Sequence, residues 1–311
     1  MNLSEAVARY VAHRQSLGMR FCRQASTLKS FCRKHGETDI DKVESERVLE
    51  FIAGTGPITL NWRTKYDTLR GLYRFLVARG YTTCDPLPSV VPKPSISFVP
   101  HIFSRDELKR LLHAVDTCQS PRRLLEGGTL RALLLLLYGA ALRLNEALAL
   151  TLADVDMTEQ TLLIRESKFY KTRLVPIDTD LRGVLAAHLA IRHQQRPASD
   201  APLFVTRAGG PVPDHLVQAA FRRLRIAAKV LRQDQIPQQP RLHDLRHSAA
   251  VHRLVHWYRS GADVQRLLPK LATFLGHVDV ASTQRYLTLI PELLNEAGAR
   301  FERYAMGDRH E

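Results

Sequence analysis

Apolar residues recur at helical spacing through roughly the first eighty positions of the chain. The segments 4–17 and 25–35 both show this period, and each is followed by a glycine that can end a helix. A longer segment, 59–79, carries an apolar side made of Tyr66, Leu69, Leu72, Tyr73, Leu76 and Val77. The pattern predicts an N-terminal region built from helices.

A proline-rich stretch follows this helical region. Proline fixes φ and lacks a backbone N–H, so several prolines close together exclude a helix and favour a stiff, extended chain. The stretch 85–100 contains Pro86, Pro88, Pro92, Pro94 and Pro100. We therefore predict two domains, 1–88 and 103–311, joined by a linker over 89–102.

The pattern beyond the linker is mainly helical again. Ser104 is expected to cap a helix, because Glu107 stands three residues later, as in a capping box. Two short β-like runs within 161–177 enclose a polar, basic turn and predict a hairpin. Further helices are expected over 181–193, 214–231, 242–258, 263–275, 280–287 and 291–304. The predicted fold class is mainly α with a small antiparallel β element.

The composition is that of a folded protein, with 45% hydrophobic and 24% charged residues among 311. The formal net charge is +14, of which +6 falls in residues 1–100 and +8 in the remainder. A positive excess spread along the chain fits a protein that grips a polyanion such as nucleic acid. It also fits charge that serves only solubility, and charge alone leaves both interpretations open.

Nothing in the sequence indicates export or membrane insertion. The first residues are charged and amphipathic, and the longest apolar run, 132–142, is about half the length of a membrane span. Four cysteines show no Cys-x-x-Cys spacing and are expected to be buried thiols in a reducing compartment: Cys22, Cys32, Cys84 and Cys118. We therefore expect a cytoplasmic protein.

Arg143 interrupts the most apolar stretch of the chain. A guanidinium is rarely buried without a paired anion, and Glu146 stands three residues later, within reach on one helix face. The pair fits either a structural ion pair at a helix start or part of an anion site.

His243 and Arg246 lie three residues apart and would project from one face of a helix. Arginine offers a planar fork to phosphate oxygens, and histidine exchanges protons near neutral pH. His243 and His247 instead have the spacing of a zinc-binding pair. Against zinc, Asp244 is shorter than the usual glutamate, Arg246 would repel a cation, and no third ligand is obvious.

The order of these residues resembles the tyrosine recombinase (phage integrase) family. The matching text consists of Ala-Leu-Arg143-Leu-Asn-Glu146, Lys168 to Ile177, His243-Asp-Leu-Arg246-His-Ser, and Leu-Gly-His277 followed by Gln-Arg-Tyr286. The resemblance is close over about 103–290, and residues 1–95 look more diffusely like the family's helical core-binding domain. It implies a site-specific DNA recombinase that cuts and rejoins strands through a 3′-phosphotyrosine intermediate, without metal, cofactor or ATP.

The resemblance also implies roles for individual residues. Tyr286 would be the nucleophile, Arg143 and Arg246 would clamp the phosphate, and Glu146 would hold Arg143 in place. The remaining catalytic candidates are Lys168 as general acid, His243 as base or positioning donor, and His277 as a hydrogen-bond donor to the phosphate.

Other assignments are less closely defined by the motifs. Lys171 is a rival for Lys168, because both lie in the hairpin turn, and the following Arg-Leu-Val-Pro favours Lys168. The stretch before His277 is longer than usual in the family and contains Pro269, which could alter the helix that carries this histidine. Candidate DNA contacts are Arg63, Lys65, Arg70, Arg74, Lys171 and Arg173.

The implied partner is double-stranded DNA with specific recombination sites. The resemblance further implies a homotetramer on synapsed DNA, with or without related recombinases, at the bacterial nucleoid in the cytoplasm. The helix over 291–304 would dock on a neighbouring protomer or, alternatively, on its own domain. The alternatives are type IB topoisomerase-like DNA relaxation, a catalytically inactive DNA-binding regulator, and a zinc hydrolase built on His243 and His247.

Overall fold

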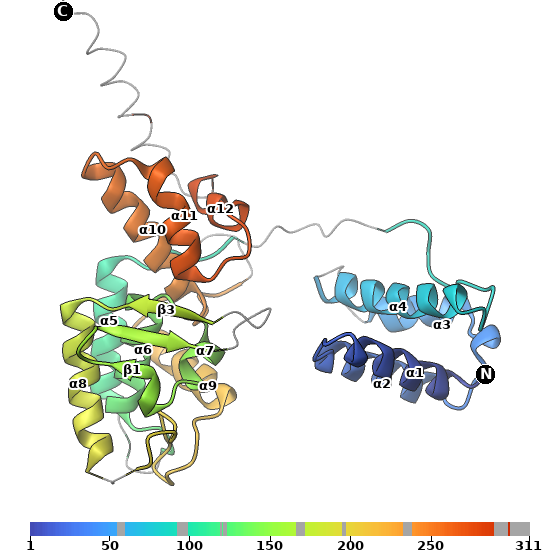
Figure 1. Ribbon diagram of the computed structural model, residues 1–311, viewed down its shortest axis with the longest axis horizontal. Coiled ribbons are helices and arrows are strands. Elements are labelled where there is room, and N and C mark those ends of the chain that lie inside the picture. Colours follow the sequence, from blue (N-terminus) through green and yellow to red (C-terminus); the bar gives the residue numbers. More distant parts are fainter. Residues whose placement is uncertain are drawn as a thin grey trace, which may run out of the picture. The chain divides into compact units, whose positions relative to one another are not determined.

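The computed structural model describes residues 1–54, 60–91, 99–118, 120, 123–165, 172–194, 197–232, 238–288 and 298. Two compact units make up the chain, 1–98 and 99–311 (Figure 1). Residues 92–98, half of the expected linker, lie outside the described residues. The functions expected of the two domains, and the linker itself, stay predictions.

The N-terminal unit consists of helices. They are α1 (Leu3–Ser16), α2 (Cys22–His35), α3 (Ser45–Ala53) and α4 (Leu60–Ala78), with a 3-10 turn at Ile40–Lys42. The helices expected over 4–17, 25–35 and 59–79 are therefore confirmed, although α2 begins three residues earlier than expected. Helix α3 was not predicted.

Local signals explain where these helices begin and end. The side chain of Asn2 caps α1 by accepting a hydrogen bond from the backbone N–H of Ser4 (2.8 Å). Gly36, with φ of 66°, ends α2 in a conformation that few other residues adopt. Helix α4 packs against α1, α2 and α3, and its predicted apolar side forms the core except for Val77, which is 45% exposed.

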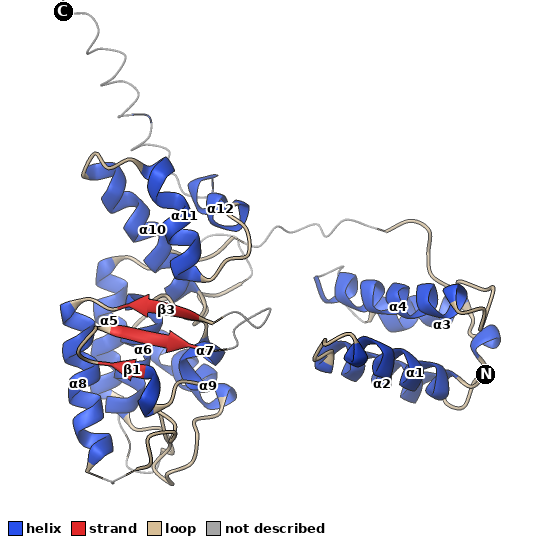
Figure 2. Ribbon diagram, viewed as in Figure 1, coloured by secondary structure: helices blue, strands red, loops and turns tan. Residues whose placement is uncertain are grey.

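The second unit combines helices with a small sheet (Figure 2). Its strands are β1 (Val155–Asp156), β2 (Thr161–Ile164) and β3 (Arg173–Pro176), in the order β1-β2-β3 and antiparallel throughout. Its helices are α5 (Arg105–Thr117), α6 (Gly127–Gly139), α7 (Leu144–Leu148), α8 (Thr179–His193), α9 (Asp214–Ala227), α10 (Asp244–Arg259), α11 (Val264–Leu275) and α12 (Ala281–Thr288).

The predicted fold class, mainly α with a small antiparallel β element, is confirmed. The expected hairpin is formed by β2 and β3, with Leu162 opposite Val175 and Ile164 opposite Arg173. Its turn, 166–171, lies outside the described residues, as does the helix expected over 291–304 apart from residue 298. Ser104 caps α5 as predicted, since its hydroxyl accepts from the N–H of Glu107 and the Glu107 carboxylate accepts from the N–H of Ser104.

The apolar stretch around 129–150 is divided between two helices. Helix α6 is buried on most sides because α5, α8 and α10 pack against it. It ends at Gly139, and Ala141 then adopts a positive φ of 49°, so the chain turns before α7 begins after Arg143. Arg143 therefore stands at a helix start, at the edge of the core rather than within it.

The remaining expectations concern the cysteines and membrane-spanning helices. Cys22 and Cys84 are exposed, and Cys32 and Cys118 are only partly buried, so the expectation of four buried thiols is wrong. In the part of the chain that the structure describes, no helix is long and apolar enough to cross a membrane.

Candidate active site

A single buried carboxylate, that of Glu146 on α7, is the centre of a cluster of arginines. Arg143 donates to it from its backbone N–H (3.0 Å) and from Nη1 (2.7 Å). Arg173 donates to both carboxylate oxygens (2.9 and 3.2 Å), and Arg246 Nη1 lies 3.9 Å away. Burial would raise the pKa of Glu146, but the hydrogen bonds from Arg173 and Arg143 outweigh it and lower this pKa to about 2.

The same three arginines also donate hydrogen bonds to backbone carbonyls at the C-terminal end of α11. Phe274 O accepts from Arg173 Nε (3.3 Å), Leu275 O accepts from Arg246 Nη2, and Gly276 O accepts from Arg143 Nη2 (3.2 Å). The last carbonyls of a helix lack intrahelical partners and carry partial negative charge, so they suit guanidinium groups. Glu146 and the end of α11 thus fix the arginine cluster together.

The three arginines differ in their exposure. The Arg246 side chain is 2% exposed and also donates to Ala141 O (2.5 Å), the carbonyl that the turn after α6 presents. The side chain of Arg173 is 10% exposed and that of Arg143 is 27% exposed. Because three guanidinium charges face one carboxylate, the cluster keeps a positive excess that suits an anion.

His277 is placed beside this cluster by the cap of α11. Gly276 adopts a left-handed conformation (φ 63°) that ends the helix, and Pro269 leaves α11 continuous. His277 Nδ1 lies 2.7 Å from the hydroxyl of Thr283, a fully buried residue of α12. Burial and the positive charges of Arg246 and Arg143 lower the pKa of His277 to about 4, so its ring is neutral at pH 7.

His243 immediately precedes α10, and its ring packs edge-on against that of His247 at 4.8 Å between centroids. Desolvation, followed by the charges of His247 and Arg246, lowers the pKa of His243. The side chain nevertheless reaches solvent, so water offsets part of this shift. Within the described residues no group of three His, Cys, Asp or Glu side chains could hold a metal, and the zinc alternative gains no third ligand there.

The structure thus brings Arg143, Glu146, Arg246 and His277 together. Tyr286 belongs to α12, three residues after Thr283, so the Thr283–His277 contact ties its helix to the cluster. The side chain of Tyr286, and the whole of Lys168 and Lys171, lie outside what the structure describes.

The basic residues of α4 have mixed environments. Arg63 pairs with Asp67 one helical turn away (3.0 Å), with both side chains more than 40% exposed. Lys65 donates to Phe51 O (2.7 Å), so its ammonium is held against α3, and the guanidinium of Arg70 lies over the ring of Tyr66. Arg70 and Arg74 are exposed, whereas Arg63 and Lys65 are partly buried.

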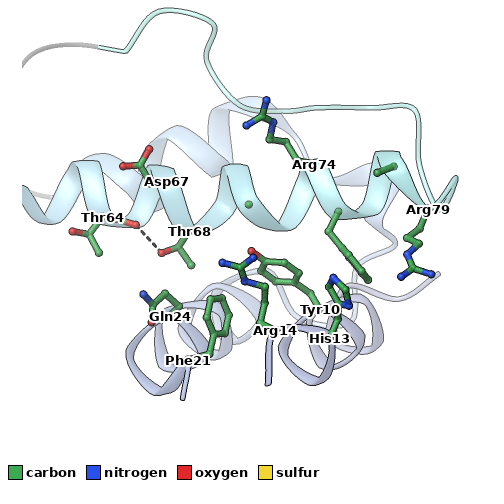
Figure 3. A pocket seen from close by; sticks show the side chains of 13 residues that line it. Tyr10, His13, Arg14, Phe21, Gln24, Thr64, Asp67, Thr68, Arg74 and Arg79 are labelled. Atoms are coloured by element: carbon green, nitrogen blue, oxygen red, sulfur yellow. Dashed lines mark hydrogen bonds between the residues drawn. The ribbon is translucent and has the colours of Figure 1, made fainter. Parts of the chain in front are cut away.

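Arg74 lines an open pocket of about 660 Å³ within the N-terminal unit. Figure 3 shows Tyr10, Arg14 and Phe21 facing α4 across this pocket, with Arg74 and Arg79 on the side of α4. The Arg14 guanidinium lies 5.5 Å from the centroid of the Phe21 ring. The lining thus combines basic and aromatic side chains with smaller polar ones.

Two residues have surroundings that the sequence motifs did not indicate. Arg173 was expected to contact DNA, but its guanidinium is used on Glu146 and Phe274 O. Its position two residues before the apolar Val175 was an available signal, since alternate residues of a strand share a face. Thr283 lies in the stretch from His277 to Tyr286 that resembles the family, but its spacing from His277 does not by itself predict a contact between the two.

Known proteins support the same class of site. Residues 101–292 match the phage integrase family. The chain is 34% identical over 304 residues to the putative integrase/recombinase y4rB of Sinorhizobium fredii, covering 96% of each protein. It is 30% identical over 264 residues to tyrosine recombinase XerD of Caulobacter vibrioides, covering 84% of this chain and 81% of that one.

A solved structure shows the same fold. The Tn1549 transposon integrase, in complex with transposon right end DNA, is similar with a TM-score of 0.70 at 15% identity, covering 98% of this chain and 100% of that one. The fold and the arginine cluster define a protein of the tyrosine recombinase class. The chain belongs to the phage integrase family, and it is a site-specific recombinase that cleaves and rejoins DNA. These relatives do not favour the topoisomerase or regulator alternatives.

Proposed function

We propose that the cluster around Glu146 binds the scissile phosphate of a recombination site and that Tyr286 attacks it. The observation that carries this proposal is the convergence of Arg143 and Arg246 on one carboxylate and one helix end, with His277 beside them. A phosphodiester gains negative charge on its non-bridging oxygens as it is attacked. Cations held in place before the reaction stabilise that charge without reorganising.

The reaction proceeds by exchange of one ester for another. The Tyr286 oxygen bonds to phosphorus, and its proton passes to His243, whose lowered pKa favours the neutral, proton-accepting form. The bond from phosphorus to the 5′ oxygen breaks, and Lys168 donates a proton to that oxygen. The resulting 3′-phosphotyrosine keeps the energy of the ester, so an incoming 5′ hydroxyl can reverse the steps without ATP.

The neutral His277 ring carries one N–H. If the Thr283 hydroxyl donates to Nδ1, the proton is on Nε2 and is directed to the phosphate. A neutral donor stabilises the transition state by a hydrogen bond, while Arg143 and Arg246 supply the charge.

The N-terminal unit would grip the duplex through α4. Arg63, Arg70 and Arg74 are the contacts that the geometry favours, with Lys65 acting mainly through its packing on α3. Exchange between two duplexes requires four strand cleavages, one tyrosine for each, so we propose a homotetramer on synapsed sites. The segment 291–304 would join neighbouring protomers, in the cytoplasm at the nucleoid.

Covalent trapping tests the reaction. Wild type, Tyr286→Phe and the control Tyr258→Phe are incubated with nicked DNA that carries the ends of the encoding element. We expect a denaturant-resistant protein–DNA adduct with wild type and Tyr258→Phe and none with Tyr286→Phe. Absence of the adduct from a wild-type protein bound to its site would contradict the proposal and support a DNA-binding regulator.

A substrate with sulfur in place of the scissile 5′ oxygen identifies the acid. A thiolate leaves without protonation, so loss of the general acid is tolerated on this substrate. We expect Lys168→Met to cleave the oxygen substrate slowly and the sulfur substrate at the wild-type rate, and Lys171→Met to behave like wild type on both. The reverse pattern would assign the acid to Lys171.

A further inference from the structure

Arg173 lies on the inward face of its strand. Val175, two residues later, is fully buried, whereas Leu174 between them is 63% exposed. Alternate residues of a strand point to the same side, so Arg173 shares the side of the core. A long cation on this face needs anionic or carbonyl partners inside the unit.

All the nitrogens of the Arg173 guanidinium have such partners. Nη1 and Nη2 donate to the two oxygens of Glu146, and Nε donates to Phe274 O. This is a two-pronged arginine–carboxylate contact, the strongest type of charge-assisted pair. The guanidinium therefore joins β3 to α7 and to the end of α11. Three of its five N–H groups are used in these contacts, and the side chain is only 10% exposed, so little of it faces a DNA phosphate.

The same group packs against Gly276. A Cβ on Gly276 would lie 2.7 Å from Cζ and Nη1 of Arg173, which is closer than non-bonded atoms approach a Cβ in folded proteins. The guanidinium thus covers the left-handed residue that ends α11 and immediately precedes His277. Any movement of Arg173 would change the support of that turn.

The charge balance gives Arg173 a specific effect on Arg143. With Arg173 in place, each oxygen of Glu146 has a second cation besides Arg143, whose side chain stays 27% exposed. Without it, Arg143 would be the only guanidinium within hydrogen-bond distance of Glu146, with Arg246 at 3.9 Å, and Glu146 would compete more strongly with a phosphate for Arg143. We propose that Arg173 is a positioning residue for strand cleavage, which neutralises Glu146 and fixes the end of α11 so that Arg143 and His277 can engage the scissile phosphate.

This inference rests on the proposed function, and it predicts a separation of DNA binding from cleavage. For Arg173→Gln we expect single-turnover cleavage to fall roughly a hundredfold, the scale of a misplaced catalytic group. Affinity for the site and its dependence on salt should stay at the wild-type values. A direct phosphate contact would instead reduce the slope of log K against log[salt] by about 0.9, and that result would overturn the inference.

Two more variants separate positioning from general damage to the fold. Arg173→Lys keeps the charge beside Glu146 but not the two-pronged contact, so we expect it to restore part of the lost rate. Arg131→Gln is the matched control, because Arg131 also bridges a carboxylate and a carbonyl, Asp116 and Leu112, but near the far end of α6. We expect its cleavage rate to be within twofold of wild type.

A double-mutant cycle and the sulfur substrate complete the test. If Arg173 acts through Glu146, then Arg173→Gln combined with Glu146→Gln should cleave about as fast as the slower single variant, whereas independent effects would multiply. The defect should persist with the sulfur leaving group, and rescue would overturn the inference by assigning Arg173 to the acid. If wild type forms no adduct, the proposed function fails; if wild type reacts and folded Arg173→Gln and Arg173→Lys react equally well, only this inference fails.

Discussion

The ion pairs along α1 and α4 in the N-terminal unit and the cluster around Glu146 in the second unit use the same charged residue types in opposite ways. In the N-terminal unit, Arg9 pairs with Glu5 and Arg63 with Asp67, each one helical turn apart and each with about half of the side chain in solvent. In the second unit, Glu146 is 6% exposed and its partners lie up to about a hundred residues away in sequence. Sequence distance and burial, rather than residue type, distinguish the two sets.

The difference has an energetic consequence. An exposed ion pair contributes about 0–1 kcal/mol, because water and salt screen it. Removing one partner of a buried pair costs about 3–5 kcal/mol, because the other charge stays desolvated. The cluster around Glu146 therefore holds its cations rigidly, as phosphoryl transfer requires, whereas the exposed pairs of the N-terminal unit leave Arg9 and Arg63 adaptable.

Glu146→Gln should have the largest effect. The change leaves three arginines without their shared carboxylate, so we expect the free energy of unfolding to fall by about 3–5 kcal/mol and cleavage to fall at least a hundredfold. Urea unfolding and single-turnover cleavage measure the two losses. Glu5→Gln is the control from the N-terminal unit, expected within about 0.5 kcal/mol of wild type; equal losses in both variants would contradict the comparison.

Gly276→Ala should come next. A residue with a Cβ costs about 1–2 kcal/mol in the left-handed conformation, and here the Cβ also meets the Arg173 guanidinium. We expect a loss of stability of at least that size and slow cleavage, measured as above. The control is Gly36→Ala, where φ is also positive (66°) but the Cβ has open space, so stability should fall while cleavage is retained.

Thr283→Val should alter the state of His277 more than the stability of the fold. The change removes the hydroxyl from Nδ1, at a cost of about 1 kcal/mol for one hydrogen bond. We expect the ¹⁵N NMR signals of His277 to shift toward a mixture of tautomers and cleavage to fall about tenfold. Unchanged signals would show that Thr283 does not fix the tautomer.

The pH dependence of stability should reflect the same histidine. The pKa of His277 is about 4 in the folded chain against 6.5 ordinarily, so below pH 6.5 the unfolded chain binds a proton that the folded chain does not. The free energy of unfolding should therefore decrease as the pH falls from about 6.5 toward 4. Chemical denaturation of wild type and His277→Gln across this range should give a shallower dependence in the variant; identical slopes would contradict the assignment.

Arg74→Gln should have the smallest effect on the fold. We expect stability within about 0.5 kcal/mol of wild type, because Arg74 lies at the rim of an open pocket. If it contacts a phosphate, the slope of log K against log[salt] should decrease by about 0.9, with an unchanged cleavage rate at saturating DNA. An unchanged slope would remove Arg74 from the proposed DNA contacts.

The sequence itself contained the local features of this protein. The period of apolar residues placed α1, α2 and α4, Ser104 with Glu107 predicted the start of α5, and the two β-like runs predicted the hairpin, because each signal acts within one or two turns of chain. Sequence motifs that resemble the family predicted Arg143, Glu146, Arg246 and His277 as site residues.

Only the tertiary structure decided how these residues meet. The positive φ of Ala141 has no local signal, since alanine rarely adopts it, and it is maintained where the chain turns between buried helices. The contacts of Arg173 likewise depend on β3 and the end of α11 lying beside α7, and the contact of Thr283 with His277 depends on α12 packing against α11. Such contacts join residues far apart in sequence, and burial makes them strong, so their partners exist only once the chain has folded.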